Sequence, residues 1–496
     1  MSVVRGTTGG VDRAATRPSR ARLRPGAATV LTALAALAGC TVTTATPPGP
    51  TSSQGGPPPP AASLAISPGP SPGGPPTTAT PTVGPSTPTL ADPVASAVLT
   101  DLLTRRSEAL RTRDKIAWLS TVADPSSADG LLESQAFDAL LALGVDGLTV
   151  GPVRAVPSPA AASTTASAAP STAPSPAAPA VSPPPGTWTG SVRVSYQVPG
   201  VDRGQRQASR TVTLLASGDG WRIGRWLGPA DAWEVFDIPA LAVARSGSAI
   251  VAGDLPVDQL ARLAGEAELA QRVVARVTRR PAPTALLVAP VTERAAARLL
   301  GRSDPAALAQ IAATTEGARP AGQPAPADRV VVNPAGMVRL NAQGRAVVLA
   351  HELTHVLIRA TTAHDVPMWL SEGFAEYVAY RDTGLTPSLV ARQLLDRVRT
   401  QGPPPALPGP ADFDPARGEL AAAYQGAWIA VRRIARERGE ERLLAFYAEI
   451  AGSPGDARMT PQSVVVSRAF AGQVGDSEAQ FVVLWRAELT ALAQSG

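Results

Sequence analysis

Cysteine and histidine are almost absent from this 496-residue sequence, which has one cysteine, three histidines and 4% aromatic residues. A single cysteine excludes an intrachain disulfide. Beyond the N-terminal segment no apolar run reaches about 18 residues, so no transmembrane helix is predicted. Residues 40–496 also lack an excess of basic residues. Residues 1–39 hold six of the 45 basic residues and one of the 40 acidic ones, which leaves 39 of each sign. Without a surviving basic patch, nucleic-acid binding is not expected.

The only cysteine, Cys40, ends a segment that is typical of an export signal. Arginines lie within residues 5–24, an apolar run extends from Gly26 to Ala38, and Leu-Ala-Gly precedes the cysteine. A positive stretch, an apolar stretch too short to span a bilayer and small residues at its end are features of a secretory signal peptide. Residues 37–40 resemble a bacterial lipobox, which implies cleavage before Cys40 and lipid on its thiol. The alternative is an ordinary signal peptide with a chance cysteine.

Proline and glycine are as abundant as cysteine is rare, with 51 and 44 copies. Fifteen prolines lie between Pro47 and Pro88, in a stretch that cannot bury enough apolar surface to offset its ordering entropy. We therefore predict a lipoprotein signal peptide in 1–39 and a disordered tether in 40–90. A second low-complexity run, 155–187, is predicted to be a disordered insertion between two strands. The protein is expected to be exported and lipid-anchored on the outer face of the bacterial cell membrane.

Residues 91–238 are predicted to form an α+β accessory domain. Apolar residues recur at helical spacing after Asp92, and residues 191–198 then alternate between apolar and polar side chains, as in a half-buried strand. Helices followed by an antiparallel sheet resemble the cone-shaped fold of the nuclear-transport-factor-2-like superfamily. The sequence does not indicate what this domain does.

Residues 239–496 are predicted to form a second α+β domain, with a small N-terminal sheet followed by helices from about Ala342 onward. The segment 328–334 is predicted to be a strand. It is either an edge strand that could pair with an extended peptide or an internal strand of the core.

The segment His351-Glu352-Leu353-Thr354-His355 places two of the three histidines four residues apart in an apolar helix. This spacing puts both rings on one helix face, close enough to bind one metal ion, with Glu352 positioned to reach a metal-bound water. Unpaired imidazoles buried in such a helix would be costly, and a metal removes that cost. The alternative is a chance arrangement of two ordinary histidines.

A second helix, expected over 366–380, supplies a third ligand. Glu372 lies in its first turns and, with the two histidines, leaves one position open for water, as catalytic zinc sites require. Glu376 is one turn further on and is expected to accept a hydrogen bond from the outer N–H of a ligating histidine. Each glutamate could instead be a solvated charge. Imidazole and carboxylate ligands suit one Zn²⁺, although other divalent ions would fit.

These residues, followed by Trp-Leu-Ser-Glu-Gly-Phe-Ala at 369–375, resemble the gluzincin metallopeptidases of the peptidase MA-like group. The resemblance implies a zinc peptidase of zincin-like fold with Glu352 as general base. Three features depart from the related alanyl aminopeptidases. The spacing to Glu372 is shorter and Ser371 replaces an asparagine. Their G-x-M-E-N motif is missing, because the segment 333–340 has no acid to hold a substrate α-amine. The last departure argues against aminopeptidase activity.

Two further residues are candidates for the site. Tyr424 begins a segment that resembles the family helix whose tyrosine stabilises the oxyanion, and its alternative is a packing tyrosine. His364 is either a proton donor near the site or an exposed loop histidine.

The sequence thus predicts a lipid-anchored zinc peptidase that acts on peptide or protein substrates. The alternative is a cell-surface binding or scaffolding lipoprotein with a structural or inactive zinc site. The substrate and the oligomeric state cannot be inferred from the sequence.

Overall fold

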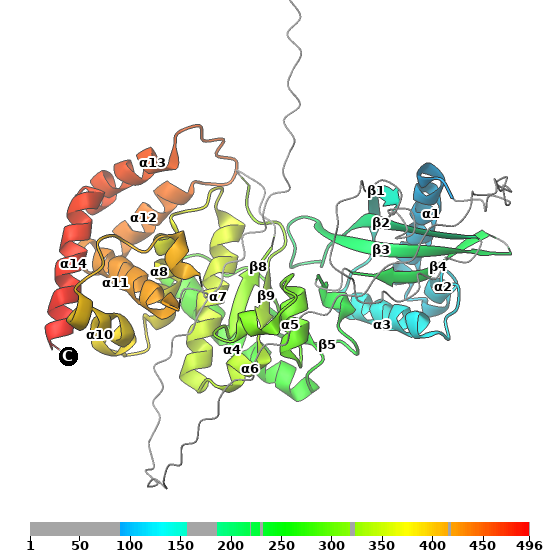
Figure 1. Cartoon of the computed structure of the whole chain (residues 1–496), viewed down its shortest axis with the longest axis horizontal. Coiled ribbons are helices and arrows are strands. Elements are labelled where there is room, and N and C mark those ends of the chain that lie inside the picture. The colour runs from blue at the N-terminus through cyan, green and yellow to red at the C-terminus, as the bar shows by residue number, and fades with distance from the viewer. Residues whose placement is uncertain are drawn as a thin grey trace, which may run out of the picture.

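The computed structural model describes residues 90–155, 186–218, 220–228, 232–317, 323–414 and 418–495. Cys40, the signal segment and nearly all of both low-complexity runs lie outside the described residues, so the predictions made for them stay predictions. Figure 1 shows the N-terminal helices and a first sheet at one end, a second sheet in the middle and a group of helices at the other end. Within the described ranges, no helix has the length and hydropathy that a membrane crossing requires.

The described part of the N-terminal unit consists of three α-helices followed by a four-stranded antiparallel sheet in the order β1-β2-β3-β4. The alternation predicted within residues 191–198 is confirmed: Val192, Val194 and Tyr196 are buried, whereas Arg193 is exposed. The likeness to the cone-shaped fold stays a prediction. The elements are α1 (Asp92–Thr112), α2 (Lys115–Leu119), α3 (Ala128–Leu143), β1 (Thr149–Ala155), β2 (Thr187–Tyr196), β3 (Arg206–Ser217) and β4 (Gly220–Leu227).

The second sheet has five strands in the order β5-β6-β7-β9-β8. Two of its pairings, β6 with β7 and β7 with β9, are parallel, and a long helix, α4 (Val257–Thr278), connects β6 to β7. Strand β5 was not predicted; it forms a hairpin with β6. The strands are β5 (Ala242–Ser246), β6 (Ala249–Gly253), β7 (Ala285–Ala289), β8 (Ala313–Glu316) and β9 (Arg329–Val332).

Of the two alternatives for the predicted strand in 328–334, the structure shows the internal strand of the core. Strand β9 lies between β7 and β8, and all four of its residues are buried, as expected for a strand with neighbours on both sides. The edge strand next to β9 is β8, which pairs with β9 in antiparallel register and lies against the predicted metal-binding helix.

The two faces of this second sheet contribute to different hydrophobic clusters. Val251, Leu287 and Val330 pack in the larger cluster with the helices that follow. Their neighbours Ile250 and Leu286 face the other way and belong to a cluster that is otherwise built mainly from the N-terminal unit. The N-terminal unit and the second sheet therefore share a hydrophobic core. The domain boundary near residue 238 stays a prediction.

The predicted helical region after Ala342 is confirmed, and its helices cover one side of the second sheet (Figure 1). Two of them, α8 and α11, pack at a glycine. A Cβ on Gly373 would lie 2.4 Å from the carbonyl oxygen of Ala427, so only glycine permits this close approach. The helices before this region are α5 (Glu293–Leu299) and α6 (Pro334–Val338). Those within it are α7 (Ala342–Thr361), α8 (Met368–Tyr380), α9 (Pro387–Val390), α10 (Arg392–Gln401), α11 (Leu420–Arg438), α12 (Glu440–Ala451), α13 (Gln462–Ala469) and α14 (Glu478–Ser495).

Candidate metal centre

The helix α7 that carries His351 and His355 is buried over most of its surface. Its first turn is capped by Asn341, whose side-chain oxygen accepts a hydrogen bond of 2.8 Å from the backbone N–H of Gly344. Apolar residues on several sides bury the helix between the second sheet and α8. This burial explains why an almost uninterrupted apolar sequence surrounds the two histidines. Only 2% of His351 and 3% of His355 is exposed.

Glu372, in the first turns of α8, lies beside the two histidines. The Nε2 atoms of His351 and His355 are 3.0 Å apart, and the Oε2 atom of Glu372 is 3.2 Å from the first and 3.4 Å from the second. Three ligands bound tetrahedrally at about 2.0–2.1 Å from one zinc ion would be separated by about 3.3 Å. The three atoms therefore already form the triangle that such an ion needs. Within the described residues, this buried group could hold a metal ion.

The hydrogen bonding of these residues supports the same fit. Two facing imidazole nitrogens can approach to 3.0 Å only if one of them carries a proton or both point at a cation. Oε1 of Glu372 is buried and has no hydrogen-bond partner among the described residues. Buried polar atoms are normally satisfied, and a cation bound to the carboxylate would satisfy this group. Two imidazoles and one carboxylate are the donor set of a catalytic zinc site with one open position.

The three predicted ligands affect one another's ionisation. Burial disfavours the imidazolium form of His351, but hydrogen bonds to Glu372 and Glu376 outweigh burial and raise its pKa to about 10. Burial also disfavours the carboxylate form of Glu372, but the charges and hydrogen bonds of the two histidines lower its pKa to about 2. Without a metal, the site therefore keeps a proton where the ion would bind.

Glu376 contacts the outer nitrogen of a predicted ligand. Its Oε1 lies 3.1 Å from Nδ1 of His351, one helical turn beyond Glu372 on α8. A carboxylate at this nitrogen fixes the ring tautomer so that Nε2 is available to a metal, and it increases the basicity of the ligand. The structure thus brings Glu376 to the outer nitrogen of His351 that the sequence predicted it would contact.

Glu352 is fully buried and is not one of the three grouped ligands. Burial raises the pKa of its carboxyl group, while the nearby histidines and a hydrogen bond from Thr315 oppose that rise. Thr315 donates its hydroxyl to Oε2 of Glu352 at 2.7 Å. Sequence reasoning missed Thr315, because nothing about a threonine in a short strand marks it as a partner of a residue 37 positions away.

Tyr424 and His364 differ in their relation to the site. The ring of Tyr424, on α11, lies 5.9 Å from the ring of His351 and packs edge-on against Phe413. Tyr424 is therefore adjacent to the candidate ligands. In contrast, Nε2 of His364 lies 3.6 Å from Asp456, and its backbone N–H donates to α12. The contacts seen for His364 do not involve the three ligands.

Comparison with known proteins gives limited information. No protein-family model and no curated protein matches the chain. Among solved structures, an M1 zinc metallopeptidase mutant from Deinococcus radiodurans covers 60% of this chain and 90% of its own, with 12% identity and a TM-score of 0.30. The same enzyme bound to a Tyr-Ser-Ala substrate covers 60% and 89%, with 13% identity and a TM-score of 0.30. A two-domain M1 zinc metallopeptidase mutant bound to L-arginine covers 61% and 90%, with 13% identity and a TM-score of 0.29. This similarity is too distant to support an assignment, which rests instead on the site itself.

Proposed function

We propose that this protein is a zinc-dependent peptidase. The observation that carries the proposal is the buried triangle of two imidazole nitrogens and one carboxylate oxygen, with Glu352 beside it. A structural zinc site would normally use four protein ligands, whereas only three group together among the described residues. This count, together with an intact Glu352, favours an enzyme over a scaffolding lipoprotein with an inert metal.

In this proposal His351, His355 and Glu372 would hold the ion, and the bound ion would act as a Lewis acid that acidifies water and polarises a peptide carbonyl. Glu352 accepts the proton of the attacking water and then transfers it to the departing amine. Burial raises the pKa of Glu352, which favours its acceptance of a proton. Glu376 keeps the ring of His351 oriented through Nδ1. The hydroxyl of Tyr424 would donate a hydrogen bond to the carbonyl oxygen as negative charge develops there.

The substitution Glu352→Gln tests the reaction. Because Glu352 is not among the three ligands, the variant should bind as much zinc as wild type. It should lose about a hundredfold to ten-thousandfold in turnover, since the proton acceptor is gone. Purified protein from residue 90 onward can be assayed on casein and on a peptide library, with and without a chelator. Unchanged turnover in Glu352→Gln would refute the mechanism, and no chelator-sensitive cleavage by wild type would refute the function.

We also propose that the protein is exported and lipid-anchored through Cys40, as its N-terminal sequence indicates. The substitution Cys40→Ala should move the protein from the membrane fraction to the soluble exported fraction. If this variant still fractionates with the membrane, the anchor lies elsewhere. Under this proposal the substrates are peptides or proteins outside the cell membrane.

A further inference from the structure

The edge strand β8 contacts the proposed catalytic base directly. Thr315, in this strand, is 0% exposed and its hydroxyl lies 2.7 Å from Oε2 of Glu352, which is also 0% exposed. The same hydroxyl lies 3.1 Å from the backbone oxygen of Glu352. A hydroxyl has one proton to donate, and the shorter distance assigns it to the carboxylate. A hydrogen bond to a charged group in such a dry environment is among the stronger ones in proteins.

This contact makes the two oxygens of Glu352 unequal. Oε2 is held by Thr315, whereas Oε1 is buried and has no hydrogen-bond partner in the described part of the chain. One oxygen is therefore fixed to the protein, and the other is left to exchange a proton with water or an amine. Without Thr315, the carboxylate could rotate and bind the metal itself, which would fill the position that water must occupy.

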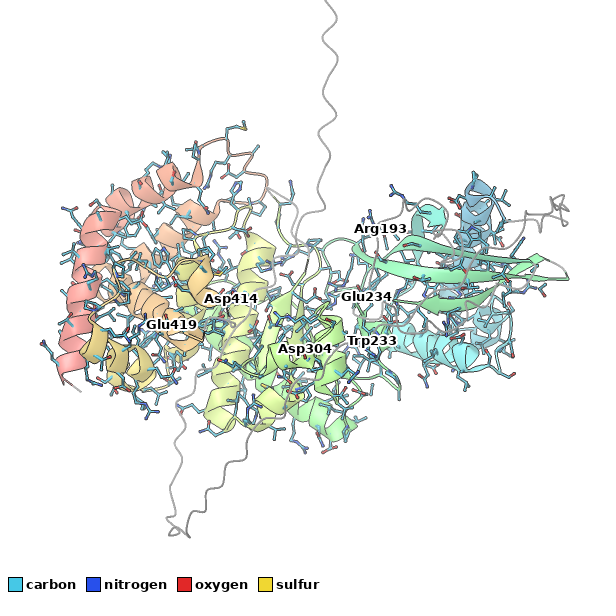
Figure 2. All side chains as sticks on the ribbon, in the orientation of Figure 1. Arg193, Trp233, Glu234, Asp304, Asp414 and Glu419 are labelled. Carbon is cyan, nitrogen blue, oxygen red and sulfur yellow. The ribbon has the colours of Figure 1, made fainter. Side chains whose placement is uncertain are left out.

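The strand that carries Thr315 is in turn held from outside the second sheet. The next residue, Glu316, accepts a hydrogen bond of 2.7 Å from Arg206, at the start of β3 in the N-terminal unit. Arg206 also donates to Glu234 at 2.7 Å, and Tyr196 donates to the same carboxylate at 2.6 Å. Figure 2 shows Glu234 between the first sheet and the second. The N-terminal unit thus contacts β8 through a partly buried polar cluster one residue away from Thr315.

The geometry points to Thr315 as the positioning residue of the catalytic base: its hydroxyl holds Oε2 of Glu352, keeps the carboxylate off the metal and directs Oε1 toward the reacting water. This inference rests on the proposed peptidase function. It also gives the N-terminal unit a role, because that unit anchors the strand from which Thr315 acts.

Three substitutions separate this role from simple packing. Thr315→Val keeps the shape of the side chain and removes the hydroxyl, whereas Thr315→Ser keeps the hydroxyl. Thr314→Val makes the same chemical change one residue earlier, at an equally buried position on the opposite face of β8. Thr315→Ala replaces Thr315→Val if the valine variant does not fold, and the same result is expected of it.

Steady-state kinetics give the first measurement. Thr315→Val should lower kcat about tenfold to a hundredfold and change KM less than about threefold, because a charged hydrogen bond that orients the base is lost. Thr315→Ser and Thr314→Val should stay within about threefold of wild type. The inference is overturned if Thr315→Val retains the wild-type kcat, or if Thr315→Ser loses as much as Thr315→Val.

The visible spectrum of the Co²⁺-substituted protein gives a second measurement that needs no turnover. If a freed Glu352 binds the metal, Thr315→Val should change the Co²⁺ absorption bands, while Thr315→Ser and Thr314→Val keep those of wild type. If wild type cleaves no peptide, the proposed function fails and this spectrum alone decides the role of Thr315. A spectrum of Thr315→Val identical to that of wild type then overturns the inference.

Discussion

At the scale of single residues, the role of Glu376 can be tested without knowing the substrate. Glu376→Ala removes the acceptor at Nδ1 of His351, so zinc affinity should fall about tenfold to a hundredfold. Glu376→Gln keeps an acceptor oxygen and should lose less. The zinc dissociation constants of wild type and both variants can be measured by competition with a chromophoric chelator. Equal affinity in wild type and Glu376→Ala would show that the contact does not support the ligand.

The raised pKa of His351 predicts the direction in which zinc affinity depends on pH. In the metal-free protein this pKa is about 10, so below that value the ion must displace a proton. Affinity should therefore rise with pH, about tenfold per unit between about pH 7 and about pH 9, with about one proton released. Calorimetry in buffers of different ionisation enthalpy counts the protons. A zinc affinity that does not change between about pH 7 and about pH 9 would contradict the raised pKa of His351.

The same shift affects the stability of the metal-free fold. Because the folded pKa of His351 lies above its usual 6.5, its protonation stabilises the folded state fully below about pH 6.5. That contribution is lost as the pH rises through about 10. Metal-free protein should thus lose stability toward alkaline pH, in the direction opposite to its gain in zinc affinity.

The site residues that could be predicted from the sequence are those that lie one helical turn from another site residue. His351 and His355 are one turn apart, and Glu376 is one turn from Glu372, so helical periodicity alone predicts which side chains share a face. Thr315 and Arg206 could not be found in this way. Their partners, Glu352 and Glu316, are 37 and 110 positions away, and only the sheet topology brings them together.

At the scale of elements, the packing of α8 against α11 depends on Gly373. Gly373→Ala would place a Cβ 2.4 Å from the Ala427 oxygen and 2.7 Å from its carbon, and backbone atoms cannot yield as a side chain can. The variant should lose about 1–3 kcal/mol of unfolding free energy in urea titrations. Gly265→Ala, in α4 where the added Cβ meets nothing within 4 Å, should be stabilising. Equal effects of the two substitutions would contradict the packing argument.

The periodicity of the sequence predicted where helices and strands form better than it predicted which strands lie side by side in the sheet. The alternation before Val198 identified β2, and the helical spacing of apolar residues after Asp92 identified α1. The place of β9 in the sheet could not be obtained from its sequence. Arg329–Val332 is four residues long and buried throughout, so it has no exposed side to show whether it lies at an edge. Strand β5 was missed because it is short and only partly buried.

At the scale of the whole molecule, a buried ion pair joins the N-terminal unit to the second sheet. Arg329, in β9, donates to both carboxylate oxygens of Asp202, at 2.5 and 2.9 Å, and their side chains are 2% and 0% exposed. Asp202→Ala should cost about 3–5 kcal/mol, because it leaves a buried guanidinium without its counter-charge. Asp258→Ala removes an exposed partner of Arg262 and should have far less effect. Urea unfolding of both variants provides the test, and similar losses would contradict it.

The shared core has a consequence for how this molecule could have been assembled. Ile250 and Leu286 in the second sheet complete the cluster that Tyr196 and Phe236 begin in the N-terminal unit. Separating the two parts would expose the apolar surface of both to water. The pair should melt in one calorimetric transition, and the N-terminal unit should resist exchange for an unrelated module. Evolution of this protein would then have had to adjust both parts together, instead of exchanging either part as an independent domain.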